Sequence, residues 1–275
     1  MQRCRPLLGT YVEIAVRPVP GVDAAQAIER AFEAIARVGA LMSFHDPRSE
    51  LSRINAARAG DELALDGWTF ALLSLARELH EATGGSFDCG VGARLREWGL
   101  LPVHADAAPV KGGQGSIADV ELLPGARIRL RRAICLDLGG IAKGFAVDRA
   151  IEALLQAGIV SAVVNAGGDM RVAGDEPRAV HVRDPAAPQR LLPLGALADG
   201  ALATSGPYFS LRGVGAAARS ALADPRSGRT LTQAASYSVL APSCAVADGL
   251  AKALAVDGRL AAHCLERFQA DAVVL

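Results

Sequence analysis

The feature that most constrains this chain is a pair of turns between residues 136 and 174, each placed where an apolar run ends. Glycines follow the first carboxylate, and a lysine stands where a helical pattern begins. Amide groups at a helix start and one ammonium favour an anion, so the spacing predicts a site for a phosphate-bearing ligand. The same residues are also typical of an ordinary strand-to-helix turn with a solvated lysine, which remains an alternative. The turns read Asp137-Leu-Gly-Gly-Ile-Ala-Lys143-Gly and Asn165-Ala-Gly167-Gly168-Asp169.

Composition excludes several classes of protein. The chain has 275 residues, 29 basic and 29 acidic side chains and 51% hydrophobic residues, which is ample material for a core. The sequence has no stripe of basic residues of the kind that binds nucleic acid. No apolar run approaches the roughly 20 residues of a membrane span. The five cysteines lack CxxC spacing, so we expect reduced core thiols. The first residues enter a strand pattern without a signal peptide, and we expect a cytoplasmic protein.

Hydrophobic periodicity predicts a mixture of helices and strands. Asp23, Asp66 and Ser243 are placed to cap three of the helices. Because several neighbouring strands read as hairpins, we expect an α+β fold in one domain over residues 1–275. The predicted helices are 23–41, 66–84, 144–158, 243–256 and 260–268. The predicted strands are 9–17, 127–136, 160–165, 179–183, 207–214, 236–241 and 272–275.

Several shorter motifs are ambiguous when taken alone. Gly90-x-Gly92 lacks the third glycine of the dinucleotide fingerprint and follows no strand, which excludes a Rossmann interpretation. Ser86-Phe87-Asp88 provides either a ring and a carboxylate beside a planar ligand, or a core aromatic and a cap. Thr204-Ser205-Gly206 is hydroxyl-rich, but no catalytic triad order surrounds it. Asp224-Pro-Arg-Ser-Gly228 is typical of a tight turn.

Two lysines stand out because only three of the 29 basic residues are lysines. Lys143 begins one predicted helix, and Lys252 lies four residues after Asp248 on one face of another. Asp248 has two interpretations. It is a ligand aimed at a metal or phosphate, or it is half of a helical ion pair worth about 0.3–0.5 kcal/mol if exposed.

Taken in order, the motifs of this chain resemble the FAD:protein FMN transferases, the ApbE-like flavin transferase family. The resemblance extends from Leu7 to Leu275, and it depends on the order of the motifs rather than on any one of them. The motifs are Leu8-Gly-Thr10, Met42-Ser-Phe-His45, Ser49-Glu-Leu-Ser52 with Asn55, Gly85-Ser-Phe-Asp88, Asp137 to Gly144, Asn165 to Asp169, Thr204 to Gly206, Asp224 to Gly228, and Ala247-Asp248.

The resemblance implies an α+β fold with T-fold-like mixed or antiparallel sheets and packed helices. It also implies FAD as substrate, with Mg²⁺ at the pyrophosphate. Such a protein moves the FMN half of FAD onto a Thr or Ser hydroxyl of a target flavoprotein and releases AMP. No nucleic acid or membrane span is expected. The alternative is an FAD-binding relative with little transferase activity, which binds FAD only or hydrolyses its pyrophosphate.

The same resemblance implies roles for individual residues. Asp248 and the carbonyl of Gly140 are expected at the metal, and Asp248 and Lys252 are the expected catalytic residues. The expected contacts with the flavin nucleotide are Leu8, His45, Ser86, Phe87, Asp88, Asp137, Lys143, Gly167, Gly168, Asp169, Thr204, Ser205 and Gly206.

Three positions depart from the family pattern. Ala221 stands where typical members have a histidine that is a candidate base, and His45 stands where many have a tyrosine. Lys252 stands where typical members have a threonine beside the metal. The ammonium of Lys252 either takes the place of the metal or points away and leaves the metal to Asp248, carbonyls and water. We expect a weakened or altered metal site.

Overall fold

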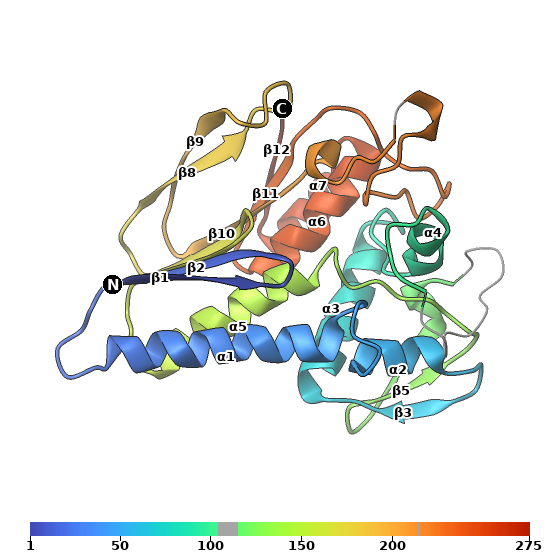
Figure 1. The fold of residues 1–275 in the computed structure, drawn as a ribbon, viewed down its shortest axis with the longest axis horizontal. Coiled ribbons are helices and arrows are strands. Elements are labelled where there is room, and N and C mark those ends of the chain that lie inside the picture. The colour runs from blue at the N-terminus through green and yellow to red at the C-terminus, as the bar shows by residue number, and fades with distance from the viewer. Residues whose placement is uncertain (104–114, 214) are drawn as a thin grey trace.

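The computed structural model describes residues 1–103, 115–213 and 215–275, and an antiparallel sheet of seven strands dominates it (Figure 1). The strand order is β1-β2-β6-β7-β10-β11-β12, so strands far apart in sequence become neighbours. This places the end of β6, the start of β7 and the end of β10 near one another. The strands are β1 (Gln2–Leu7), β2 (Thr10–Val16), β6 (Ala162–Ala166), β7 (Asp169–Ala173), β10 (Gly200–Ser205), β11 (Tyr237–Ala241) and β12 (Asp271–Val274).

Three helices, α1 (Ala24–Met42), α5 (Ala142–Gln156) and α6 (Cys244–Asp257), form the layer that packs with the sheet (Figure 1). Helix α5 contacts α1, α6, β6 and β7, and α6 contacts β10 and β11. Asp23 caps α1 as predicted, because its carboxylate accepts from the amides of Ala25 and Gln26 at 3.0 Å. Apolar side chains on one face of α1 are fully buried in the core, which follows from their helical spacing.

Smaller elements complete the fold. Asp66 caps α3 (Gly67–Ala82) and Ser243 caps α6, as predicted. None of the helices in the described ranges combines the length and apolar character needed to cross a membrane. The remaining elements are α2 (Glu50–Ala56), β3 (Glu62–Ala64), α3 (Gly67–Ala82), α4 (Gly92–Glu97), η2 (Ile117–Asp119), β4 (Val120–Leu123), β5 (Arg127–Leu130), β8 (Arg178–Arg183), β9 (Leu191–Leu197), η3 (Pro207–Phe209), η4 (Gly215–Ala217) and α7 (Ala262–Phe268).

Two strand predictions need correction. The strand predicted over 207–214 is wrong, because Pro207 begins a short 3-10 helix and lacks the amide that a strand ladder needs. The strand predicted over 127–136 ends at Leu130. The core-thiol prediction holds for four of the five free cysteines, because Cys4 is exposed. The other predicted helices and strands are present with ends shifted by a few residues.

Candidate functional site

Two cavities adjoin at the turn before α5. The first has a volume of about 350 Å³ and lies among the loop after α3, the end of β10, α6 and the arm over 221–231. The second, of about 650 Å³, lies between the β1–β2 turn and the end of α1 with the loop that follows it. Asp137, Gly139 and Lys143 line both cavities. The turn that the sequence singles out is therefore the junction between two hollows.

The structure brings nearly all the predicted site residues to these cavities. Leu8 and His45 line the second cavity. Gly168 and Asp248 line neither: the amide of Gly168 donates to Asn165 at 2.9 Å, and Asp248 is fully buried beneath the two lysines. The predicted residues along the first cavity are Ser86, Phe87, Asp88, Asp137, Gly140, Lys143, Gly167, Asp169, Thr204, Ser205, Gly206 and Lys252.

Four alternating charges form what we call the charged floor: Asp169, Lys143, Asp248 and Lys252. Lys143 pairs with Asp169, and its Nζ lies 3.8 Å from Oδ2 of Asp248. Lys252 pairs with Oδ1 of Asp248, one helical turn away. The carboxylates are 0–3% exposed, whereas the lysine side chains are 21% and 32% exposed and line the first cavity. Both lysines therefore border the first cavity together with Asp169, whereas Asp248 lies beneath them and lines neither cavity.

Burial and charge act against each other in the charged floor. Burial opposes the charge of Lys143, but Asp169 and Asp248 outweigh it and raise the pKa of the lysine. Burial and the nearby Asp248 raise the pKa of Asp169. For Asp248, burial is outweighed by the two lysines, which lower its pKa. Lys143 is therefore charged at neutral pH, and of the two carboxylates Asp248 holds its charge more firmly.

Asp148 connects the three elements that carry the charged floor, a role that the sequence analysis does not predict. Its carboxylate accepts from the hydroxyl of Ser243 at 2.8 Å and from the amides of Cys244 and Ala245 at 2.9 Å. Arg171 on β7 also pairs with it at 2.8 Å. A carboxylate at a helix N-terminus is stabilised by the amides there. Asp148 thereby ties α5, β7 and the start of α6 together.

Gly144 lets α5 and α6 approach closely. A Cβ atom at this position would lie 2.3 Å from the carbonyl oxygen of Cys244, so no larger residue fits without movement of a helix. The amide of Gly144 donates to Oδ2 of Asp248 at 3.1 Å. The glycine beside Lys143 thus has a packing reason as well as a place at a helix start.

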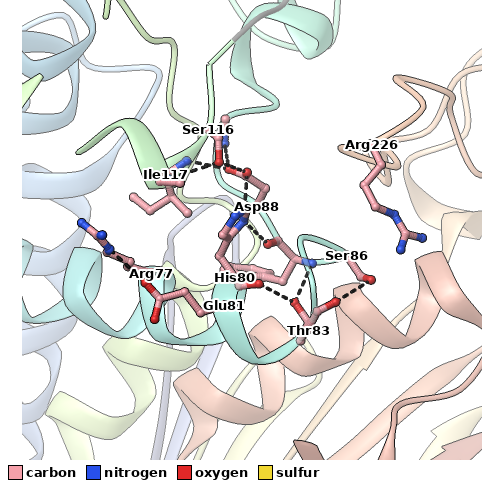
Figure 2. A network of polar contacts seen from close by, with 12 residues as sticks. Arg77, His80, Glu81, Thr83, Ser86, Asp88, Ser116, Ile117 and Arg226 are labelled. Atoms are coloured by element: carbon pink, nitrogen blue, oxygen red, sulfur yellow. Dashed lines mark hydrogen bonds and ion pairs between the residues drawn. The ribbon is translucent and has the colours of Figure 1, made fainter. Parts of the chain in front are cut away.

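Asp88 organises one side of the first cavity (Figure 2). Its oxygens accept from the Ser116 hydroxyl at 2.5 Å and from the amides of Gly90 and Ile117 at 2.7 and 2.9 Å, and Nδ1 of His80 lies 3.0 Å away. Burial opposes the charge, but these donors outweigh it and lower the pKa of Asp88. Asp88 thus joins the loop over 84–91 to Ser116 and Ile117, but it is not the N-cap of α4, which is Val91, or of η2, which is Ser116.

His80 was not predicted to matter, and no spacing signal marks it. Nδ1 of His80 lies within 3.2 Å of the carbonyl of Phe87 as well as 3.0 Å from Asp88. Because both neighbours are acceptors, this nitrogen carries the proton. The hydrogen bond to Asp88 is the largest cause that raises the pKa of His80, against the effect of burial. His80 therefore fixes the backbone and the carboxylate beside the cavity.

Asp257, at the end of α6, joins two loops beside the cavity. The hydroxyl of Ser86 contacts one of its oxygens, and Nη2 of Arg226 donates to the other at 2.5 Å. Arg226 belongs to the predicted turn at 224–228, which is present: the amide of Gly228 donates to the carbonyl of Asp224 at 2.8 Å. We call the loop over 84–91 and the arm over 221–231 the outer wall. It includes the methyl group of Ala221, which lines the first cavity.

One hydroxyl in the first cavity lacks a partner within the described part of the chain. Ser205, at the end of β10, has a buried Oγ that makes no hydrogen bond there, whereas the neighbouring Thr204 hydroxyl pairs with Ser238 at 2.8 Å. Buried polar atoms in native proteins nearly always have a partner. Ser205 also borders the first cavity, so its hydroxyl is a candidate partner for a water molecule or a ligand atom there.

The expected metal ligands do not fit a divalent ion in this arrangement. One oxygen of Asp248 pairs with Lys252, and the other accepts from Gly144 and faces Lys143. The stem of Lys252 packs on Gly140, since a Cβ there would lie 3.4 Å from its Cγ. Magnesium prefers several oxygen ligands in octahedral geometry, and the described residues contain no group of three His, Cys, Asp or Glu side chains that could hold a metal.

The antiparallel sheet and its packed helices define an α+β fold that matches solved structures of ApbE proteins. Residues 8–274 match the model of the ApbE family, and the chain belongs to that family. It is similar to the flavin transferase ApbE from Vibrio cholerae, with TM-score 0.81 and 27% identity over 100% of this chain and 92% of that one. It also resembles the ApbE protein from Thermotoga maritima, with TM-score 0.79 and 28% identity over 93% and 86%.

Curated relatives agree with this membership. An FAD:protein FMN transferase from Rhodobacter capsulatus is 33% identical over 92% of this chain. Another from Vibrio cholerae is 30% identical over 92% of this chain and 80% of the relative. The chain spans only half the length of the Rhodobacter capsulatus relative. The fold and family predictions are confirmed, whereas the roles given to individual site residues stay predictions.

Proposed function

We propose that this protein is an FAD:protein FMN transferase, which moves FMN from FAD to a Thr or Ser hydroxyl of a target flavoprotein and releases AMP. The observation that carries the proposal is the junction of two cavities at the glycine turn and lysine that begin α5. Family membership and the names of the curated relatives support it.

The shape of the site suits a ligand with two ring systems joined by a diphosphate. We assign the diphosphate to the junction at Asp137, Gly139 and Lys143, with one ring system in each cavity. Amides at the start of α5 and the ammonium of Lys143 suit the anion. The two cavities fall in the range of about 300–1,000 Å³ that small-molecule sites occupy. The unpaired hydroxyl of Ser205 supplies a hydrogen bond to the ligand in the first cavity.

The proposed reaction is attack at phosphorus. The oxygen of the acceptor hydroxyl forms a bond with the FMN phosphorus, the bond from that phosphorus to the bridging oxygen breaks, and AMP leaves with that oxygen and its electron pair. The hydroxyl proton passes to a base. Ala221 carries no titratable group, so we propose Asp137: burial raises its pKa, and it pairs with no lysine or arginine within the described residues. Lys143 and Lys252 offset the charge on the phosphates.

The remaining proposals concern context. We propose that the partner is a flavoprotein with an accessible Thr or Ser, that residues 1–275 form one domain, and that the protein acts in the cytoplasm. Free cysteines, most of them buried, suit a reducing compartment.

A direct assay tests the proposal. The purified protein is incubated with FAD and a Thr-bearing flavoprotein acceptor, with and without MgCl₂, the mixture is denatured, and fluorescence on the acceptor band and AMP are measured. We expect both products. AMP without a labelled acceptor would indicate a pyrophosphatase, and bound FAD with neither product would indicate a binding protein.

Ser205→Ala sharpens the assay because it removes one unpaired hydroxyl and nothing else. We expect FAD affinity to fall about tenfold, with thermal stability unchanged or slightly higher, since no internal hydrogen bond is lost. Equal FAD affinity in the variant and the parent, measured by calorimetry, would remove Ser205 from the site.

A further inference from the structure

We propose that the ammonium of Lys252 is a built-in cation that takes the place of a divalent metal at the diphosphate, so that this chain binds FAD without Mg²⁺. The inference rests on the proposed function, because it assumes that FAD is the ligand at the charged floor. It deepens that function by naming the group that neutralises the phosphates.

The first argument is the state of Asp248. This carboxylate is fully buried, and both of its oxygens are engaged by groups of the chain itself: Lys252 at Oδ1, and the amide of Gly144 at Oδ2, with Lys143 3.8 Å from the same oxygen. A metal would have to displace an ammonium from a buried carboxylate. Breaking a buried ion pair is costly, because one charge is left without its partner.

The second argument is the position of Lys252. The side chain starts one helical turn after Asp248, and its stem packs on Gly140, the residue whose carbonyl the family resemblance assigns to the metal. Its ammonium thus lies beside the expected metal carboxylate, while its stem lies against the expected metal carbonyl. The side chain is 21% exposed and lines the first cavity. An ammonium has three donors, so pairing with Asp248 leaves two for phosphate oxygens.

The third argument is charge. Within the charged floor the two lysines balance Asp169 and Asp248, and a divalent ion placed there would lie within a few ångströms of both ammonium groups. Like charges at that distance repel strongly in a buried site. The floor therefore excludes a divalent ion more readily than a site in which a neutral side chain occupies position 252.

The test measures FAD binding by calorimetry in EDTA and in saturating MgCl₂. For the parent protein we expect dissociation constants that agree within about twofold in the two buffers. For Lys252→Thr we expect the affinity in EDTA to fall at least about tenfold, equal to about 1.4 kcal/mol, and to recover when Mg²⁺ is added. Arg178→Thr, which removes an exposed charge on β8, is the matched control and should behave as the parent does.

Metal binding gives a second readout that does not depend on activity. Titration with Mn²⁺, followed by electron paramagnetic resonance in the presence of FAD, should show no stoichiometric binding to the parent and one bound ion in Lys252→Thr. Lys252→Met keeps the length of the stem without the charge, and it replaces the threonine variant if that variant fails to fold.

The outcomes separate this inference from the proposed function. If the parent binds FAD only when Mg²⁺ is present, or binds one Mn²⁺, then Lys252 does not replace the metal while the flavin transferase proposal stands. If the parent binds no FAD in either buffer, both proposals fail.

Discussion

The charged floor and the outer wall are built in opposite ways. The floor carries its charges on regular elements, α5, β7 and α6, and its carboxylates are 0–3% exposed. The outer wall carries its contacts on loops, and the pair that closes it, Arg226 with Asp257, has side chains 48% and 33% exposed. Ion pairs in a buried setting are costly to break, whereas exposed pairs contribute little. We therefore expect the floor to hold its charged side chains in fixed positions, and the outer wall to adjust more easily to a bound ligand.

The comparison gives a ranking of effects. Changes in or below the floor should cost stability and ligand affinity, because they leave buried groups without partners. Changes in the wall should act on access and on pH response, with small effects on the free energy of unfolding.

The largest effect on stability is expected at Asp148, which joins the three elements that carry the charged floor. Asp148→Ala leaves the hydroxyl of Ser243, two amides and Arg171 without their acceptor. We expect the free energy of unfolding to fall by about 3–4 kcal/mol, measured by urea denaturation. Asp175→Ala, at an exposed position, is the control and should change stability by less than about 0.5 kcal/mol. A similar loss in both variants would show that Asp148 is not a special support.

The next effect is expected at Lys143, which faces both cavities. Lys143→Ala leaves Asp169 and Asp248 facing each other without the cation between them. We expect FAD affinity to fall about 100-fold, or about 2.7 kcal/mol, by calorimetry, and Lys143→Arg to recover part of it. An alanine variant that binds FAD within about threefold of the parent would contradict the assignment of the diphosphate to this junction.

The loop over 84–91 in the outer wall should respond to pH through His80 of α3, which contacts Phe87 and Asp88. Its raised folded pKa means that its stabilising charge is fully present below the unfolded value of 6.5 and is lost as pH rises through the folded pKa. The lowered pKa of Asp88 means that its contribution is present above 3.8 and is lost as pH falls through the folded pKa. The pair therefore stabilises most between these two unfolded values.

The comparison of the parent with His80→Gln isolates this contribution. We expect the parent to exceed the variant in stability by about 0.5 kcal/mol at about pH 5, with the difference shrinking above neutral pH. Denaturation curves across this range measure it. A difference that is constant with pH would mean that His80 acts through packing rather than charge.

The smallest effect is expected at Arg226, in the exposed part of the wall. Arg226→Ala removes the bond to Asp257, and we expect less than about 0.5 kcal/mol of lost stability. Because the arm is then held by fewer contacts, FAD should dissociate severalfold faster in stopped-flow measurements. A loss of stability comparable with that of Asp148→Ala would remove the distinction between floor and wall.

Local spacing was sufficient where the relevant contacts are local. The cap at Asp23, the turn at 224–228 and the shared helix face of Asp248 and Lys252 all lie within a few residues, and each is present. The pattern predicted the fold class for the same reason, because helical and strand periods are local properties. It failed at Pro207, where a single missing amide changes a strand into a helical turn.

The contacts that shape the site are long-range, and no spacing reveals them. Lys143 meets Asp169 because β6 and β7 bring the second turn back beside the start of α5. Asp148 meets Ser243 across 95 residues, and Ser86 meets Asp257 across 171. Only the order of the motifs, through the family resemblance, placed these segments at one site.

The hydrogen atom that Gly144 has in place of a side chain sets the spacing between the two lysine-bearing helices. An added methyl group would push α6 away from α5 and carry Lys252 with it. The distance between the two ammonium groups therefore depends on residue 144, which lies outside both cavities. Efforts to redirect this protein toward other nucleotides or acceptors should therefore hold residue 144 constant and diversify the arm over 221–231. There, altered side chains can change selectivity without disturbing the alignment of charge.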